Sequence, residues 1–200
     1  LFRSGIACLF ALTVAIQLGY YLIVFLRFAR FNPSEQNLEN NEPVSVIIAA
    51  HNEDFNLEKN MPFIFEQDYP NFEVVIVNHA STDDTHHVLN DFSRSHKNLK
   101  VVNIDEDLNF FKGKKFPLSI GIKSASHEIL LLTDADCKPE SNQWIKQMVS
   151  NYDANTEIIL GYGPYSKGES FLNKIIRYDT FMIALQYFSF AICKLPYMGV

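Results

Sequence analysis

The sequence predicts an α/β fold, with a mostly parallel sheet covered by helices on both faces and preceded by a transmembrane helix. Two observations lead to this prediction. A long apolar run lies near the start of the chain, and beyond it short β-branched runs alternate with segments of helical character. The 200 residues suffice for one domain with an appendage. We expect an anchor at 1–30, a linker at 31–43 and the α/β domain at 44–200.

The apolar run Gly5–Leu26 is the expected membrane span. At about 1.5 Å per helical residue it is long enough to cross a hydrocarbon core of about 30 Å. Arg27 and Arg30 follow the run, whereas Arg3 alone precedes it. The positive-inside rule therefore predicts a single helix in the cell (inner) membrane, with the rest of the chain cytoplasmic. The alternatives are a signal peptide, which has a shorter apolar core, and a buried soluble helix.

The remainder of the chain alternates between expected strands and helices. Near-continuous apolar strands suit a parallel sheet that is covered on both faces. The form Ser81-x-x-Asp84 is that of a capping box and predicts a helix start. Strands are expected at 44–50, 73–78, 99–103, 128–133 and 157–161, and helices at 57–67, 81–95 and 117–125, with a further one capped by Ser141.

Charge and cysteine content exclude several classes of function. The formal net charge is −6, which does not fit a nucleic-acid partner, because phosphate backbones attract clustered Lys and Arg. The three cysteines are widely separated and show no paired spacing. A disulfide framework or a zinc site is therefore not expected.

Asp134 and Asp136 are the strongest candidates for chemistry. They stand one residue apart at the end of an expected apolar strand, where two carboxylates need a neutralising partner. Mg²⁺ or Mn²⁺ suits this position, because such ions combine one or two carboxylates with phosphate oxygens and water. The alternative is a solvated turn that caps the next helix. Polar segments at 50–53 and 78–81 also follow strands, where ligands of such sheets bind.

Two other polar segments are open to more than one interpretation. Lys114 and Lys115 precede an expected helix, where an anion is favoured, although a solvated basic loop explains them equally well. Metal-like residues also gather at 83–87, in the sequence Asp-Asp-Thr-His-His. We interpret them as the first turn of a helix, where acidic residues are favoured by the helix dipole.

Five segments together resemble family 2 glycosyltransferases, which have the GT-A fold. The segment VSVIIAAHNE resembles the family's opening VSVIIPAxNE, QDYPNFE its Q-x-Y-P-x-F-E, and VNHASTDDT its V-D-D-G-S-T-D-x-T. The fourth segment is Gly113-Lys114 followed by Leu118, Gly121 and Ile122, which resembles the family's GK…AL-N-x-G-I. The fifth is the DAD at 134–136. The resemblance covers about 44–161 in the family's order. Bacterial members that act on surface polymers often carry an N-terminal membrane helix.

The resemblance implies a role for individual residues. The loop from Ala50 through Asn52 to Glu53 would border the nucleotide, with Glu53 near the base or ribose. Lys114 would contact the nucleotide or its diphosphate. Asp134 would approach the ribose and also support the metal, and Asp136 would ligate the metal that bridges the phosphates.

Asn78 and His79 stand where the family usually has the two Asp residues of DDGS, of which the second contacts the base. We expect both residues to lie near the nucleotide. Because they replace the residues that the family usually has there, the nucleotide bound by this chain can differ from the family's usual one. A histidine can change charge near neutral pH, so donor binding is expected to depend on pH. The general base of the family lies in a later acidic motif, and we expect it beyond Val200.

The resemblance implies inverting transfer of a sugar from a UDP- or GDP-linked donor to a polysaccharide, lipid-linked or cell-surface glycan acceptor. The alternatives are an inactive membrane-bound protein that binds nucleotide-sugars, and a haloacid-dehalogenase-like phosphatase. The phosphatase class places its D-x-D after the first strand, whereas here it follows the fourth. The apolar segment 181–193 is too short to span a bilayer and is either a packing helix or an interfacial one.

Overall fold

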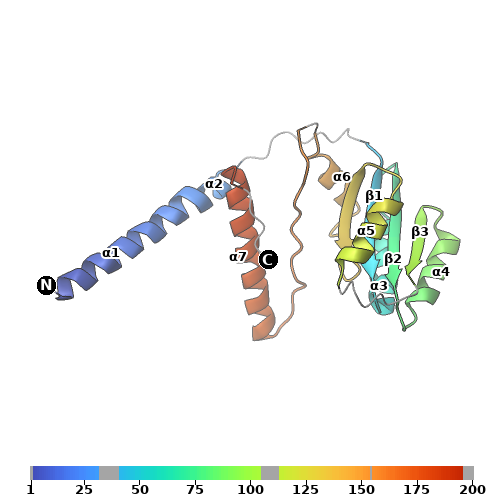
Figure 1. Ribbon diagram of the computed structural model, residues 1–200, viewed down its shortest axis with the longest axis horizontal. Helices are drawn as coiled ribbons and strands as arrows, with labels where there is room; N and C mark the ends of the chain where they lie inside the picture. Colours follow the sequence, from blue (N-terminus) through green and yellow to red (C-terminus); the bar gives the residue numbers. More distant parts are fainter. Residues whose placement is uncertain (1, 32–40, 105–112, 154, 196–200) are drawn as a thin grey trace. The chain divides into compact units, whose positions relative to one another are not determined.

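A computed structural model describes residues 2–31, 41–104, 113–153 and 155–195 (Figure 1). The chain divides into two compact units. One is formed by Gln36–Ile159 and contains the sheet, and the other combines Leu1–Glu35 with Leu160–Val200. Most of the expected linker, 32–40, lies outside the described residues.

The sheet has four strands in the order β3-β2-β1-β4, and all three neighbouring pairs are parallel. The strands are β1 (Val44–Ala50), β2 (Phe72–His79), β3 (Leu99–Ile104) and β4 (Ile129–Asp134). The two central strands are buried almost throughout, as their apolar sequences predict. The expected parallel α/β sheet is therefore confirmed.

Helices cover both faces of the sheet. On one face, α3 (Asp54–Phe65), α4 (Thr85–Ser95) and α6 (Trp144–Val149) form a core with alternate residues of the strands. On the other face lies α5 (Lys115–Ser124), which Figure 1 shows over the strands. A Cβ atom on Gly121 of α5 would lie 2.6 Å from Cγ2 of Ile47, so this glycine allows the close approach of helix and sheet.

Two expectations about local structure were wrong. Residues 157–161 form no strand, and the Ile158 side chain is 78% exposed. The β-branched run there has strand propensity, but among the described residues no strand pairs with it. The capping box was also misplaced, because α4 begins at Thr85 and Ser81 instead accepts a hydrogen bond from a different loop.

The other unit is built from two helical segments. The first runs through α1 (Phe2–Tyr20), the π-helical turn η1 (Tyr21–Phe25) and α2 (Leu26–Ala29). Its stretch Gly5–Ala29 is long and apolar enough to cross a membrane, and only 6% of its most apolar window is buried. Such low burial does not fit the core helix of a soluble protein.

The second segment is α7 (Phe171–Ile192), which contains nearly all of the apolar stretch 181–193. Its C-terminal half packs against the end of the first segment. Phe188 stacks on Phe28 with ring centroids 6.2 Å apart, and Phe190 lies 6.0 Å from Tyr20. Packing therefore explains this half of α7, while Phe171, Leu172 and other apolar residues of its first turns stay exposed.

Candidate active site

The candidate site lies at the carboxyl edge of the sheet, where the direction of chain progression reverses. The chain passes from β1 outward to β2 and β3, and then returns to place β4 on the free side of β1. Such a reversal opens a crevice between the ends of the two adjacent strands. The register pairs Ala49 of β1 with Asp134 of β4, so the loop after β1 and the Asp134–Asp136 turn face the same crevice.

Asp134, Asp136 and Cys137 form a group that can hold a metal ion. One ligand atom from each residue lies within 4.8 Å of the others. The helix α3 supports this turn, because the side-chain amide of the buried Asn60 donates a hydrogen bond of 3.0 Å to the Ala135 carbonyl. Hard carboxylate oxygens suit Mg²⁺ or Mn²⁺. The two aspartates thus fit the expected metal, while the thiol of Cys137 and the support from Asn60 were not anticipated.

Lys114 lies against this group. Its Nζ is 2.9 Å from Oδ2 of Asp134, and the hydrogen bond to Asp134 raises the pKa of Lys114 above its ordinary value. The negative charges of Asp136 and Glu53 act in the same direction. Four residues from three segments of the chain therefore share one electrostatic environment.

Glu53 has a defined orientation within this group, because its Oε2 accepts a hydrogen bond of 2.6 Å from the amide of Asn56. The carboxylate is thus fixed by its own helix, α3. This geometry allows Glu53 to accept from a hydroxyl or amine of a ligand in the crevice.

The loops after β1 and β2 are joined by hydrogen bonds. Asn52 adopts a left-handed conformation with φ of 56°. Its backbone N–H donates to Ser81 Oγ at 3.0 Å, and its side-chain oxygen accepts from the Thr82 backbone at 2.8 Å. The Glu53 backbone N–H donates to Thr85 Oγ1 at 2.9 Å. The backbone N–H and the side-chain oxygen of Asn52, a residue predicted to border the nucleotide, thus also hold the two loops together.

Asn78 and His79 lie at the end of β2. The Asn78 amide donates to Asn103 Oδ1 at 3.1 Å, while its own Oδ1 is buried without a hydrogen-bond partner among the described residues. The His79 Nε2 is likewise buried and unpartnered there. Its carbonyl oxygen lies 2.6 Å from Nδ1 of His51, and its ring meets that of Phe116 edge-on.

Asp83, the first of the metal-like residues at 83–87, has a structural role just before α4, which begins at Thr85. Asp83 accepts hydrogen bonds from the backbone N–H groups of Thr85 and Asp54. Partial burial alone would raise the pKa of Asp83, but these hydrogen bonds outweigh it and lower the pKa. The Asp83 carboxylate thus stabilises the starts of two helices.

Comparison with known proteins identifies relatives of one kind. The model of the family described as "Glycosyl transferase family 2" matches residues 45–193. The chain is 32% identical over 120 residues to glycosyltransferase AglE of Haloferax volcanii, covering 59% of this chain and 38% of that protein. It is 31% identical over 136 residues to poly-beta-1,6-N-acetyl-D-glucosamine synthase of Staphylococcus epidermidis, covering 64% and 32%.

A solved structure has a similar fold. It is the mannosyltransferase PcManGT from Pyrobaculum calidifontis in complex with GDP-Man and Mn²⁺, with a TM-score of 0.60 and 30% identity. The match covers 70% of this chain and 42% of that one. The chain therefore spans less than half the length of each of these three relatives.

Proposed function

Because the chain belongs to glycosyl transferase family 2, we propose that it transfers a sugar from a nucleoside-diphosphate sugar to a glycan or lipid-linked acceptor, with inversion at the anomeric carbon. The observation that carries the proposal is the cluster of Asp134, Asp136, Lys114 and Glu53 at the carboxyl edge of the sheet. Carboxylates for a metal and a lysine for phosphate meet there at a strand-order reversal, where nucleotides bind in such folds.

The chemistry of the leaving group explains this residue set. When the bond between the sugar and the diphosphate breaks, negative charge develops on the phosphate oxygens, and nearby positive charge stabilises the transition state. A divalent ion, when bound, would supply part of that charge. We assign its ligands to Asp136 and Asp134, and contact with the diphosphate to Lys114. The base that removes the acceptor's proton is expected beyond Val200.

The nucleotide is proposed to lie along the loops after β1 and β2. Ala50, Asn52 and Glu53 would border it, and Asn78 and His79 would lie toward the base. Oδ1 of Asn78 and Nε2 of His79 are buried and have no hydrogen-bond partner among the described residues. They support this placement, because such atoms are costly unless a ligand or water satisfies them. The similar mannosyltransferase was solved with GDP-Man and Mn²⁺, which makes GDP and UDP the first nucleotides to test, with Mn²⁺ and then Mg²⁺.

Membrane anchoring is the second part of the proposal. We infer that Gly5–Ala29 crosses the inner membrane and that the sheet unit is cytoplasmic, where nucleotide-sugars are made. The low burial of the helix supports a membrane span, and Arg27 and Arg30 at its C-terminal end support this orientation. A reporter fused after Phe31 should therefore be cytoplasmic.

The experiment that tests the site is calorimetry of nucleotide binding to Asp136→Ala. Mn²⁺-dependent binding of GDP or UDP should weaken by about tenfold or more, because the metal loses its ligand. Asp91→Ala, which removes an exposed carboxylate from α4, is the matched control and should bind as the native protein does. Unchanged affinity in Asp136→Ala would exclude the metal role. Binding without turnover of any donor by the full-length protein would instead favour the inactive binding protein.

A further inference from the structure

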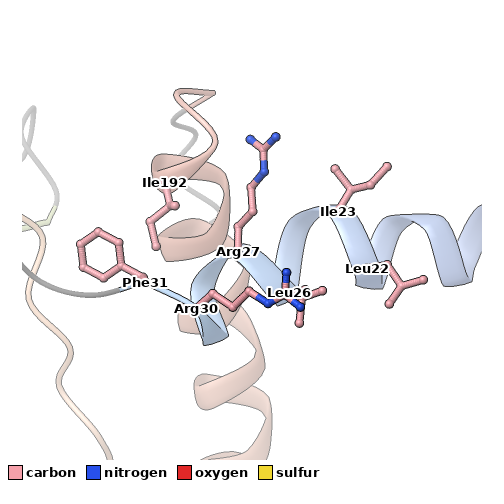
Figure 2. Close-up of a pocket in the computed structure, with 7 residues that line it drawn as sticks. All are labelled: Leu22, Ile23, Leu26, Arg27, Arg30, Phe31 and Ile192. Atoms are coloured by element: carbon pink, nitrogen blue, oxygen red, sulfur yellow. The ribbon is translucent and has the colours of Figure 1, made fainter.

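The helical unit contains a hollow of about 570 Å³ at the end of the candidate membrane span. Figure 2 shows that six of its lining residues come from the first helical segment and its end, and that Ile192 comes from α7. The six are Leu22, Ile23, Leu26, Arg27, Arg30 and Phe31. The lining is thus apolar apart from two arginines.

Among the residues that the structure describes, neither arginine is neutralised by a salt bridge. Both are exposed, and no carboxylate within residues 2–31 and 155–195 lines the hollow. Guanidinium groups favour bidentate contacts with phosphate oxygens. The hollow therefore offers positive charge beside an apolar wall.

The position of the hollow along the helix identifies the phosphate source. About 20 helical residues cover a hydrocarbon core of about 30 Å, so a span that enters at Gly5 leaves near Val24. Arg27 and Arg30 then lie about 4 and 9 Å further along the helix axis, at the depth of lipid phosphates. Tyr20 and Tyr21, about one helical turn before this boundary, are residues typical of the membrane interface.

We propose that this hollow binds one anionic phospholipid. Its phosphate would contact Arg27 and Arg30, and the first carbons of its acyl chains would lie along Leu22, Ile23 and Leu26. The proposal rests on the membrane anchoring proposed above. A free phosphate or nucleotide would gain nothing from the apolar wall, whereas a phospholipid satisfies both parts of the lining.

Native mass spectrometry of the full chain in detergent tests the proposal. Phosphatidylglycerol is offered against phosphatidylcholine of the same acyl chains, and we expect about tenfold greater retention of phosphatidylglycerol. The double variant Arg27→Gln/Arg30→Gln should lose this preference, and Arg27→Lys/Arg30→Lys should keep part of it. Lys174→Gln/Arg177→Gln, which removes two charges from α7 outside the hollow, is the matched control and should retain it.

Three outcomes would overturn the lipid site. They are equal retention of the two lipids, an equal loss in the α7 control, and displacement of the lipid by inorganic phosphate, which would indicate a free-anion site. Failure of anchoring is measured separately, because an unanchored protein would be extracted from membranes by alkaline carbonate. Donor binding in the same preparations reports on the sheet unit alone.

Discussion

Lys114 and Asp134 form an ion pair where the metal and the diphosphate are proposed to bind. The lysine side chain is 65% exposed and that of Asp134 is 48% exposed, so solvent screens the pair and it contributes little to stability. We propose a functional meaning instead. Lys114 supplies positive charge to Asp134, and a metal ion at the proposed site would have to compete with it.

Replacing Lys114 by Met should therefore have opposite effects on two ligands. Mn²⁺ alone should bind the variant more tightly by a few-fold, because Asp134 is no longer occupied. The nucleoside diphosphate with Mn²⁺ should bind about tenfold more weakly, because a contact to its phosphates is lost. Calorimetry with each ligand measures both. Lys146→Met on α6 is the control, and a parallel loss of both affinities would contradict the competition.

At the scale of elements, α3 supports the candidate site through contacts that its sequence does not reveal. The Asn60 amide on this helix supports the turn that carries the two aspartates. Just after the helix, the buried Gln67 accepts from the Ile145 backbone and donates to the Ser141 carbonyl. The motif residue Gln67 thus joins α3 to α6, which is a structural role.

Asn60→Ala should weaken both folding and metal binding. The Ala135 carbonyl would lose its buried partner, which costs about 1–3 kcal/mol in the free energy of unfolding. The turn would also be less fixed, so Mn²⁺ affinity should fall several-fold even when the variant is fully folded. Thermal unfolding and metal titration measure the two effects. Asn90→Ala, on the exposed face of α4, should change neither, and native Mn²⁺ affinity in folded Asn60→Ala would contradict the positioning role.

The sequence predicted the elements better than the contacts between them. The four strands are mostly apolar runs bounded by polar turns, and near-complete burial of the two central ones, β1 and β2, gave these the clearest signal. The fifth expected strand had the same local signal but no neighbour to pair with among the described residues, which a sequence does not reveal. Ser81 looked like a helix cap because its competing partner, Asn52, lies in a different loop.

The site was predicted in part for the same reason. Asp134, Asp136, Lys114 and Glu53 were identified by motif and by position after strands, and they lie together in the structure. Asn60 carries no motif, and only the three-dimensional contact reveals it. The burial of His79 Nε2 depends on neighbours from other elements, which no local pattern encodes.

At the scale of the whole molecule, one end of the sheet carries the candidate site, and the opposite end carries a charged structural contact. Opposite the candidate site, the Glu73 carboxylate accepts hydrogen bonds from Ser45 Oγ and from the backbone and side chain of Ser126. Burial alone would raise the pKa of Glu73, but these hydrogen bonds and nearby His127 outweigh it and lower the pKa. The Glu73 carboxylate thus links β2 to Ser45 of β1 and to Ser126 at this end of the sheet.

The lowered pKa gives a stability that depends on pH. A carboxylate with a depressed pKa stabilises the fold above its ordinary value of 4.5, and that contribution is lost as the pH falls through the folded-state pKa. Glu73→Gln should therefore lower the melting temperature near neutral pH, and the difference from native protein should shrink in acid. Thermal unfolding from about pH 3 to about pH 7 measures this. Glu58→Gln, on an exposed part of α3, is the control, and a difference independent of pH would contradict the assignment.

The division into two units also bears on domain organisation. We proposed a catalytic domain at 44–200, and the family match extends over 45–193. Residues 160–200 nevertheless form their compact unit with the N-terminal helical segment. The C-terminal part of the matched region is therefore packed against the proposed anchor, which would couple membrane insertion to the folding of the α7 region.

The contact at Gly121 has a consequence for how the chain tolerates insertions and deletions. Because this glycine fixes where α5 touches the sheet, Lys114, about two helical turns earlier, is held at a set distance of about 10 Å along the helix. Adding or removing one residue between them would rotate the lysine by about 100° and carry it away from Asp134. The number of residues from 114 to 121 is therefore constrained, even where the identity of the individual side chains between them is not.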